Sequence, residues 1–182
     1  MKHRIRRFAE GDRDAMLGFA ATLPEHDLMF LGRDLRHPRV VEAWLSAIGE
    51  GWIDSLVAED AEGELLGTAA LVRDPLGWSG HVGEVRLLVA ARHRGAGLGR
   101  DLLEGVFAIA TEHGLTKLSA RMTPDQAGSV ALFESLGFRG EALLRDEVRD
   151  GAGKLHDLVI LSLDIGRAAA HGRALGLEDA GA

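Results

Sequence analysis

The feature that most constrains the fold is a glycine-rich turn at residues 94–100, which reads Arg-Gly-Ala-Gly-Leu-Gly-Arg. The apolar segment Val85–Val89 precedes this turn and is typical of a β-strand. After the turn, apolar side chains recur at the spacing of one helix face, at Leu98, Leu102, Leu103, Val106, Phe107 and Ala110. The order is therefore strand, glycine-rich turn and helix, as in α/β folds.

This turn has the chemistry of an anion-binding loop. Gly95, Gly97 and Gly99 let the backbone approach a phosphate closely, and the helix that follows begins with free N–H groups and a partial positive charge. Arg94 and Arg100 add positive charge at the two ends. We therefore expect the turn to bind a phosphorylated cofactor.

Two common phosphate-binding motifs do not fit the turn. A P-loop ends in Gly-Lys and then Ser or Thr, and this turn has neither the lysine nor the hydroxyl. A dinucleotide fingerprint reads G-x-G-x-x-G near the start of its fold, with an acid about 20 residues later. Here the turn lies mid-chain and its glycines are spaced evenly at 95, 97 and 99.

The turn instead resembles the R-x-x-G-x-G/A signature of the GNAT N-acetyltransferases, with Arg94, Gly97 and Gly99 at the defining positions. A second block at residues 126–138 is similar to the family pattern Asn-x-x-Ala-x-x-Leu-Tyr-x-x-x-Gly-Phe. The matching residues there are Leu132, Gly137 and Phe138, whereas the usual Asn, Ala and Tyr are replaced by Gln126, Ser129 and Phe133. The resemblance covers about residues 3–165.

The resemblance implies an α/β fold of the GNAT type, with a mixed central β-sheet and helices on both faces. It implies one domain at residues 1–165, followed by a C-terminal tail at residues 166–182. It also implies acetyl-CoA as co-substrate. The residues it assigns to acetyl-CoA binding are Leu87, Leu88, Val89, Arg94, Gly95, Ala96, Gly97, Leu98, Gly99, Arg100, Gln126 and Phe133.

Hydrophobic periodicity and turn residues predict the element order β-α-α-β-β-β-α-β-α-β-β. Besides the helix after the glycine-rich turn, helices are expected over residues 12–23, 38–48 and 125–136, with Asp12 placed to cap the first. Strands are expected over residues 3–8, 55–59, 65–73, 80–89, 115–122, 138–149 and 155–163.

Composition excludes several other classes of protein. The 182 residues are 46% hydrophobic and 27% charged, which is ordinary for one globular domain. A net charge of −7 disfavours a nucleic-acid partner, and the absence of cysteine excludes thiol catalysis and cysteine-bound metal. We expect no metal site and no membrane span, a cytoplasmic location, and a small-molecule or protein amine as partner; a homodimer is compatible with the resemblance.

Glu84 is the candidate catalytic residue. The resemblance implies that an acid near the start of this strand acts as general base, often through a water molecule. The alternative is a structural role for Glu84, facing solvent or paired with Arg86 or Arg121. His156 and Asp157 do not form a simple dyad, because adjacent strand residues point to opposite faces.

Phe133 is the main departure from the family pattern. The usual Tyr there donates a proton to the leaving thiolate, and this chain contains no tyrosine. Arg121 is a second departure, because some relatives that acetylate protein N-termini carry Glu at this point. Trp78 and His81 precede the central strand and are candidates for the wall of the acceptor pocket.

The leading hypothesis is an acetyl-CoA-dependent N-acetyltransferase that acts on a primary amine of a small molecule or a protein by direct attack. A close alternative is the same fold with a larger acyl group. The absence of tyrosine keeps open a catalytically silent acyl-CoA-binding or regulatory module.

Overall fold

The computed structural model describes residues 3–166, and within them the element order is the one expected from the sequence. The α-helices are α1 (Arg13–Ala21), α2 (Pro38–Gly49), α3 (Leu98–Glu112) and α4 (Ala127–Ser135). The strands are β1 (Arg4–Arg7), β2 (Ile53–Glu59), β3 (Leu65–Arg73), β4 (Val82–Val89), β5 (Lys117–Met122), β6 (Arg139–Arg149) and β7 (Leu155–Asp164). The sequence did not indicate the short 3-10 turns at Glu10–Asp12, Glu25–Asp27, Met29–Leu31 and Ala91–His93.

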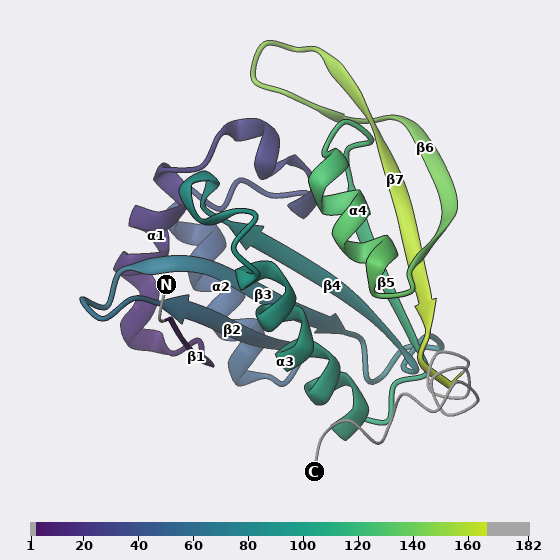
Figure 1. Ribbon diagram of the computed structural model, residues 1–182, viewed down its shortest axis with the longest axis horizontal. Coiled ribbons are helices and arrows are strands. Elements are labelled where there is room, and N and C mark those ends of the chain that lie inside the picture. The colour runs from purple at the N-terminus through teal and green to yellow at the C-terminus, as the bar shows by residue number, and fades with distance from the viewer. Residues whose placement is uncertain (1–2, 167–182) are drawn as a thin grey trace.

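The strands form one seven-stranded mixed sheet in the order β1-β2-β3-β4-β5-β7-β6. All neighbouring strands are antiparallel except β4 and β5, which are parallel and joined by the crossover through α3. Helices α1 and α2 cover one face, and α3 and α4 cover the other (Figure 1). The predicted fold class, a mixed sheet with helices on both faces, is confirmed.

Each face of the sheet has its own hydrophobic core. The first core packs the apolar stripe of α3, together with Phe133 and Phe138, against the sheet. The second core joins α1, residues 28–35 and Val41 of α2 to the opposite face. Strand β4 contributes to both, with Val85 in the first core and Leu88 in the second, because successive strand residues alternate between faces.

The sheet opens between β4 and β5. These two strands pair only from Val82 to Val85 of β4 and from Lys117 to Ala120 of β5. Beyond Val85, β4 stays paired with β3 up to Val89, and β5 stays paired with β7 up to Met122. The last residues of β4 therefore have an unpaired edge toward the gap, which Figure 1 shows between β4 and β5.

Asp12 precedes α1 but does not cap it through its side chain. Its carboxylate instead accepts hydrogen bonds from both terminal nitrogens of Arg6, at 2.7 and 2.8 Å, and from the N–H of Ala9 at 2.8 Å. The hydrogen bonds from Arg6 lower the pKa of Asp12 against the opposing effect of burial, with a further contribution from Ala9. Asp12 therefore ties the start of α1 to β1.

Replacing Asp12 with Asn is expected to lower the free energy of unfolding by about 1–3 kcal/mol at pH 7, because a charge-assisted pair is lost in a buried place. Since the folded-state pKa is lowered, the stabilisation is complete above the unfolded pKa of about 3.9 and is lost as pH falls through the folded value. Urea unfolding should show the two proteins converging toward low pH. The control is Asp14→Asn, which replaces an exposed side chain of α1 and should change the free energy of unfolding little.

No helix among residues 3–166 is long and apolar enough to cross a membrane. In the same part of the chain, no group of three or more His, Asp and Glu side chains is placed to hold a metal ion. The expected tail at residues 166–182 lies, apart from Gly166, outside the described residues.

Candidate active site

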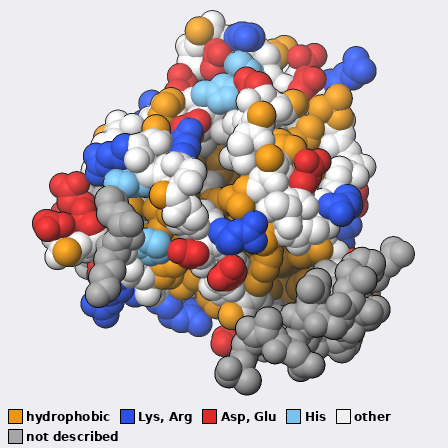
Figure 2. Space-filling model, viewed as in Figure 1, with side chains coloured by type: hydrophobic (Ala, Val, Ile, Leu, Met, Phe, Trp, Pro, Cys, Tyr) orange, Lys and Arg blue, Asp and Glu red, His pale blue; other side chains and the backbone are white. Residues whose placement is uncertain are grey.

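The gap between β4 and β5 leads into a cavity of about 660 Å³, called the cofactor cavity below. Its walls come from the end of β4, the glycine-rich turn, the end of β5 and the first part of α4. The face seen in Figure 2 is hollowed near its centre, with acidic and basic side chains interspersed around apolar ones. The segments that form the walls of the cofactor cavity are distant in the sequence, and they surround the space left where β4 and β5 diverge.

The edge of β4 that faces this cavity has unused backbone groups. The N–H of Ala90 binds the C=O of Leu66, and the N–H of Lys117 binds the C=O of His81. Because hydrogen-bonding direction alternates along a strand, Leu87 and Val89 direct their N–H and C=O toward the cavity. Leu88 directs its own toward β3. Of the groups that face the cavity, the C=O of Val89 already accepts a hydrogen bond from Nε of Arg94 at 3.0 Å. The edge offers backbone partners to an extended amide-containing chain, which is the chemistry of a pantetheine arm.

The glycine-rich turn closes one end of the cofactor cavity. Gly95 and Gly97 adopt φ values of +76° and +88°, a conformation that side chains with a Cβ rarely adopt. Within residues 3–166, the N–H groups of residues 95–99 have no protein acceptor. These N–H groups and the start of the 15-residue helix α3 form a cradle that fits a pyrophosphate.

Gly99 serves packing rather than turn geometry. A Cβ on Gly99 would lie 3.0 Å from Cδ2 of Leu132 and 3.4 Å from Cδ2 of Leu87. The glycine thus lets the start of α3 approach both β4 and α4 closely. Arg100, one residue later, donates to the hydroxyl of Ser135 at 3.0 Å, which links the turn to the end of α4.

Ten of the twelve residues predicted to bind acetyl-CoA line the cofactor cavity. The two that do not are Ala96 and Leu98, and the Leu98 side chain is buried in the first core. Leu98 can therefore contribute only its backbone N–H. Gln126 lines the cavity at the start of α4 and accepts a hydrogen bond from the N–H of Thr123 at 3.3 Å.

Phe133 lies between the cofactor cavity and the first core. Its side chain is in the cavity wall, yet the residue is only 3% exposed. The ring meets Phe138 edge to face, with 5.0 Å between centroids. Its ring therefore offers apolar surface to the cofactor cavity.

Glu84 lies on the opposite face of β4 from Val85 and does not line the cofactor cavity. Its carboxylate accepts a hydrogen bond from Nε of Arg86 at 2.7 Å and lies 3.7 Å from Nε of Arg121. Both pairings that the sequence offered as a structural role are therefore present. Arg121 itself does line the cavity, so Glu84 reaches the site through that side chain.

Residues 25–27 contact three other segments around the site, and no motif in the sequence indicated this role. Glu25 accepts from the N–H of Gly151 at 2.9 Å, and His26 Nε2 lies 3.0 Å from Asp125. Asp27 accepts a hydrogen bond from the terminal nitrogen of Arg94. The hydroxyl of Thr123 and then the charge of His26 lower the pKa of Asp125.

Two other sequence-based expectations have clear outcomes. His156 pairs with Asp150 at 2.8 Å and not with its neighbour Asp157, as the alternation of strand residues required. The prediction that Trp78 lines the acceptor pocket is wrong, because its side chain is fully exposed in the β3–β4 loop at 103% relative accessibility. His81 is also exposed and lines none of the described cavities.

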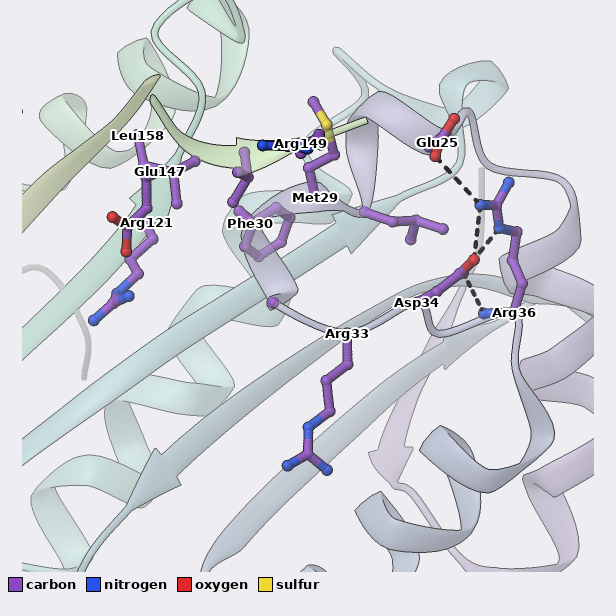
Figure 3. Close-up of a pocket in the computed structure, with 13 residues that line it drawn as sticks. Glu25, Met29, Phe30, Arg33, Asp34, Arg36, Arg121, Glu147, Arg149 and Leu158 are labelled. Carbon is purple, nitrogen blue, oxygen red and sulfur yellow. Dashed lines mark hydrogen bonds and ion pairs between the residues drawn. The ribbon is translucent and has the colours of Figure 1, made fainter. Parts of the chain in front are cut away.

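A second cavity of about 410 Å³, called the acceptor cavity below, adjoins the first. The two share Phe30 and Arg121 as lining residues. In Figure 3, Arg121, Glu147 and Leu158 lie at one end of it, and Glu25, Asp34 and Arg36 lie at the other. A molecule in this cavity would meet the inner part of the cofactor cavity at Arg121.

Residues 17–138 match the family model described as the acetyltransferase (GNAT) family. The chain belongs to the GNAT family. It is 32% identical over 126 residues, 68% of this chain and 72% of the relative, to an L-methionine sulfoximine/L-methionine sulfone acetyltransferase from Pseudomonas paraeruginosa. This GNAT protein is an N-acetyltransferase, and acetyl-CoA is its co-substrate.

Solved GNAT structures share the fold. A ribosomal-protein-alanine N-acetyltransferase from Brucella melitensis has a TM-score of 0.76 at 26% identity, covering 89% of this chain and 99% of that one. A spermidine N-acetyltransferase from Vibrio cholerae, solved with CoA and spermine, has a TM-score of 0.75 at 19% identity, covering 92% and 98%. An acetyltransferase structure from Salmonella typhimurium with its cofactor acetyl-CoA has a TM-score of 0.75 at 24% identity, covering 91% and 95%.

Proposed function

We propose that this GNAT protein transfers the acetyl group of acetyl-CoA to the primary amine of a small molecule. The observation that carries the proposal is the acceptor cavity, which meets the cofactor cavity at Phe30 and Arg121. Its volume of about 410 Å³ suits a metabolite-sized acceptor. The relative from Pseudomonas paraeruginosa, which acts by its name on L-methionine sulfoximine, supports the same class.

The proposed reaction is direct attack. The amine nitrogen adds to the carbonyl carbon of the thioester, gives up a proton to a base, and the carbon–sulfur bond then breaks to release CoA as a thiolate. The enzyme's contribution is to hold the two reactants together and to stabilise the oxyanion. Backbone N–H groups on the unpaired edge of β4 are the proposed hydrogen-bond donors to this oxyanion.

Glu84 is proposed as the base. It lies beside Arg121, which lines both cavities, and is 22% exposed at the side chain. A carboxylate there can take the proton from the amine through one water molecule. Within residues 3–166 the chain offers no tyrosine to protonate the thiolate, which leaves readily because it is weakly basic.

The test is release of CoA, followed with a thiol reagent, over a broad panel of amines and against a reaction without enzyme. At least one small amine is expected to raise CoA release well above that background. Purified protein that binds acetyl-CoA but accelerates release with no amine would contradict an enzymatic role and favour the silent binding module.

Phe133→Tyr is expected to change turnover only modestly, because the native chain is proposed to work without a phenolic acid. Phe133→Ala is expected to weaken acetyl-CoA binding by about 1–3 kcal/mol, since the ring supplies apolar surface to the cavity wall. Calorimetric titration with acetyl-CoA measures the second effect.

The matched control for Phe133→Ala is Phe107→Ala. Phe107 also stacks on Phe138, with centroids 6.1 Å apart, but does not line the cofactor cavity. Both variants should lose stability, and only the first should lose affinity. If the native protein acetylates no amine and Phe133→Tyr creates activity, the native chain is a binding module.

A further inference from the structure

The acceptor cavity has an unusual set of charged side chains. Four arginines line it, namely Arg33, Arg36, Arg121 and Arg149. Three acids line it as well, namely Glu25, Asp34 and Glu147. The question is which of these charges are already satisfied within the protein and which remain for a ligand.

One end of the cavity is neutralised internally. Arg36 donates two hydrogen bonds of 2.8 Å to the two carboxylate oxygens of Asp34 and lies 4.0 Å from Glu25. Glu25 also accepts from the N–H of Gly151. The hydrogen bonds from Arg36 lower the pKa of Asp34, so that carboxylate stays ionised and paired. These groups form a closed cluster, drawn with dashed lines in Figure 3.

The other arginines are not satisfied in this way. Within residues 3–166, the side chains of Arg33 and Arg149 make no hydrogen bond or ion pair with the protein. The closest approach of Arg121 to Glu84 is 3.7 Å, from Nε, and the two terminal nitrogens of Arg121 donate no hydrogen bond to the protein in the same range. In Figure 3 the side chains of Arg33, Arg121 and Arg149 point in different directions, and Arg121 is the one of the three that also lines the cofactor cavity.

The balance of unpaired charge is therefore positive. Within the described residues, Glu147 is the one lining acid whose side chain makes no hydrogen bond or ion pair, whereas the side chains of three lining arginines, Arg33, Arg121 and Arg149, donate no hydrogen bond. An arginine fork matches a carboxylate with two parallel hydrogen bonds. A polycationic amine would meet like charge there, which costs binding energy.

We infer that the acceptor cavity binds an amine that also carries a carboxylate, an amino acid or a close analogue, and that Arg121 binds the carboxylate. The inference rests on the proposed function and names the class of its substrate. Arg121 stands where the two cavities meet, so a carboxylate bound there holds a neighbouring amine close to the thioester and to Glu84. Glu147 offers a partner to the ammonium group on entry.

The experiment compares each amino acid with its own primary amide, using CoA release as readout. The two share a side chain and an amine and differ in the carboxylate. The amine of the amide is less basic and more of it is unprotonated near neutral pH, so a preference for the acid reports carboxylate recognition. We expect kcat/KM for the best amino acid to exceed that of its amide on the order of 10–100-fold.

Variants assign the effect to residues. Arg121→Gln should reduce the ratio of acid to amide by about tenfold or more, and Arg149→Gln should reduce it less. Arg145→Gln is the matched control, because Arg145 is exposed on the same strand as Arg149 but lines neither cavity. The control should keep the native ratio. A native ratio near one, or a preference for spermidine over every amino acid, would overturn the inference and leave the proposed acetyl transfer in place.

A binding measurement separates the two proposals. N-acetyl amino acids, the expected products, are titrated calorimetrically into the full chain with CoA present, alongside their amides. If no amine is turned over but the acids bind more tightly than the amides, and Arg121→Gln removes the difference, the carboxylate site stands and the acetyl transfer fails. If acids and amides bind equally, the carboxylate site fails.

Discussion

Gly97→Glu is expected to abolish acetyl-CoA binding while the protein stays folded. Gly97 is the residue before α3, with φ +88°, and nothing lies within 4 Å of a Cβ built on it. A glutamate there would place a negative charge in the cradle of free N–H groups, where phosphate oxygens would otherwise bind. It would also strain the left-handed backbone that aims these N–H groups into the cavity.

The control must carry the same backbone strain away from the cradle. Gly63, in the β2–β3 turn, has φ +85° and also has open space around its Cβ position. Gly63→Glu should lose a similar amount of stability and keep its affinity. Calorimetry measures binding, and circular dichroism with urea unfolding establishes that both variants fold. A folded Gly97→Glu protein with native affinity would remove the phosphate-binding role of this turn.

Glu84→Gln is expected to lower turnover by roughly 10²–10⁴-fold, the range for loss of a general base. Gln has nearly the same shape and still accepts a hydrogen bond from Arg86, but it cannot take a proton at neutral pH. Acetyl-CoA affinity should change little, because Glu84 does not line the cofactor cavity. Steady-state kinetics with a turned-over amine and calorimetry with acetyl-CoA give the two numbers.

A purely structural role for Glu84 makes a different prediction. If Glu84 matters because it holds Arg86, then Arg86→Gln, which breaks the same 2.7 Å hydrogen bond, should reduce turnover as much as Glu84→Gln. As a base, Glu84 keeps its function without Arg86, and Arg86→Gln should cost far less. Equal losses in the two variants, or full turnover in Glu84→Gln, would return Glu84 to the structural interpretation.

Features set by short stretches of chain were predictable from the sequence. Apolar periodicity located every helix and strand of residues 3–166, since each element must hide one face in a core. The position of the glycine-rich turn between a strand and a helix was also predictable, and in the structure Gly95 and Gly97 adopt the positive φ values that other residues rarely adopt. The prediction that Asp12 caps the first helix was wrong, because its carboxylate pairs with Arg6, and capping rules consider only the residues near the helix start.

Contacts between distant segments were not predictable. Asp27 meets Arg94 across 67 positions of sequence, and His26 meets Asp125 across 99. Nothing in the residues 25–31 themselves marks them as a wall of the site, because their pattern is that of an irregular loop. Trp78 failed as a pocket residue for the same reason, since nearness to β4 in sequence did not bring it to the cavity.

The sequence by itself determined the family, the order of elements and the position of the glycine-rich turn, because these depend on local backbone conformation and on motifs a few residues long. Only the tertiary structure decided where the sheet opens and what surrounds the opening. Strands β4 and β5 separate after four residue pairs, which frees the edge of β4 at Leu87 and Val89 and places Arg121 between two cavities. The divergence of these two strands depends on the side chains that pack on both faces of the sheet, so it cannot be predicted from the sequence of any single segment.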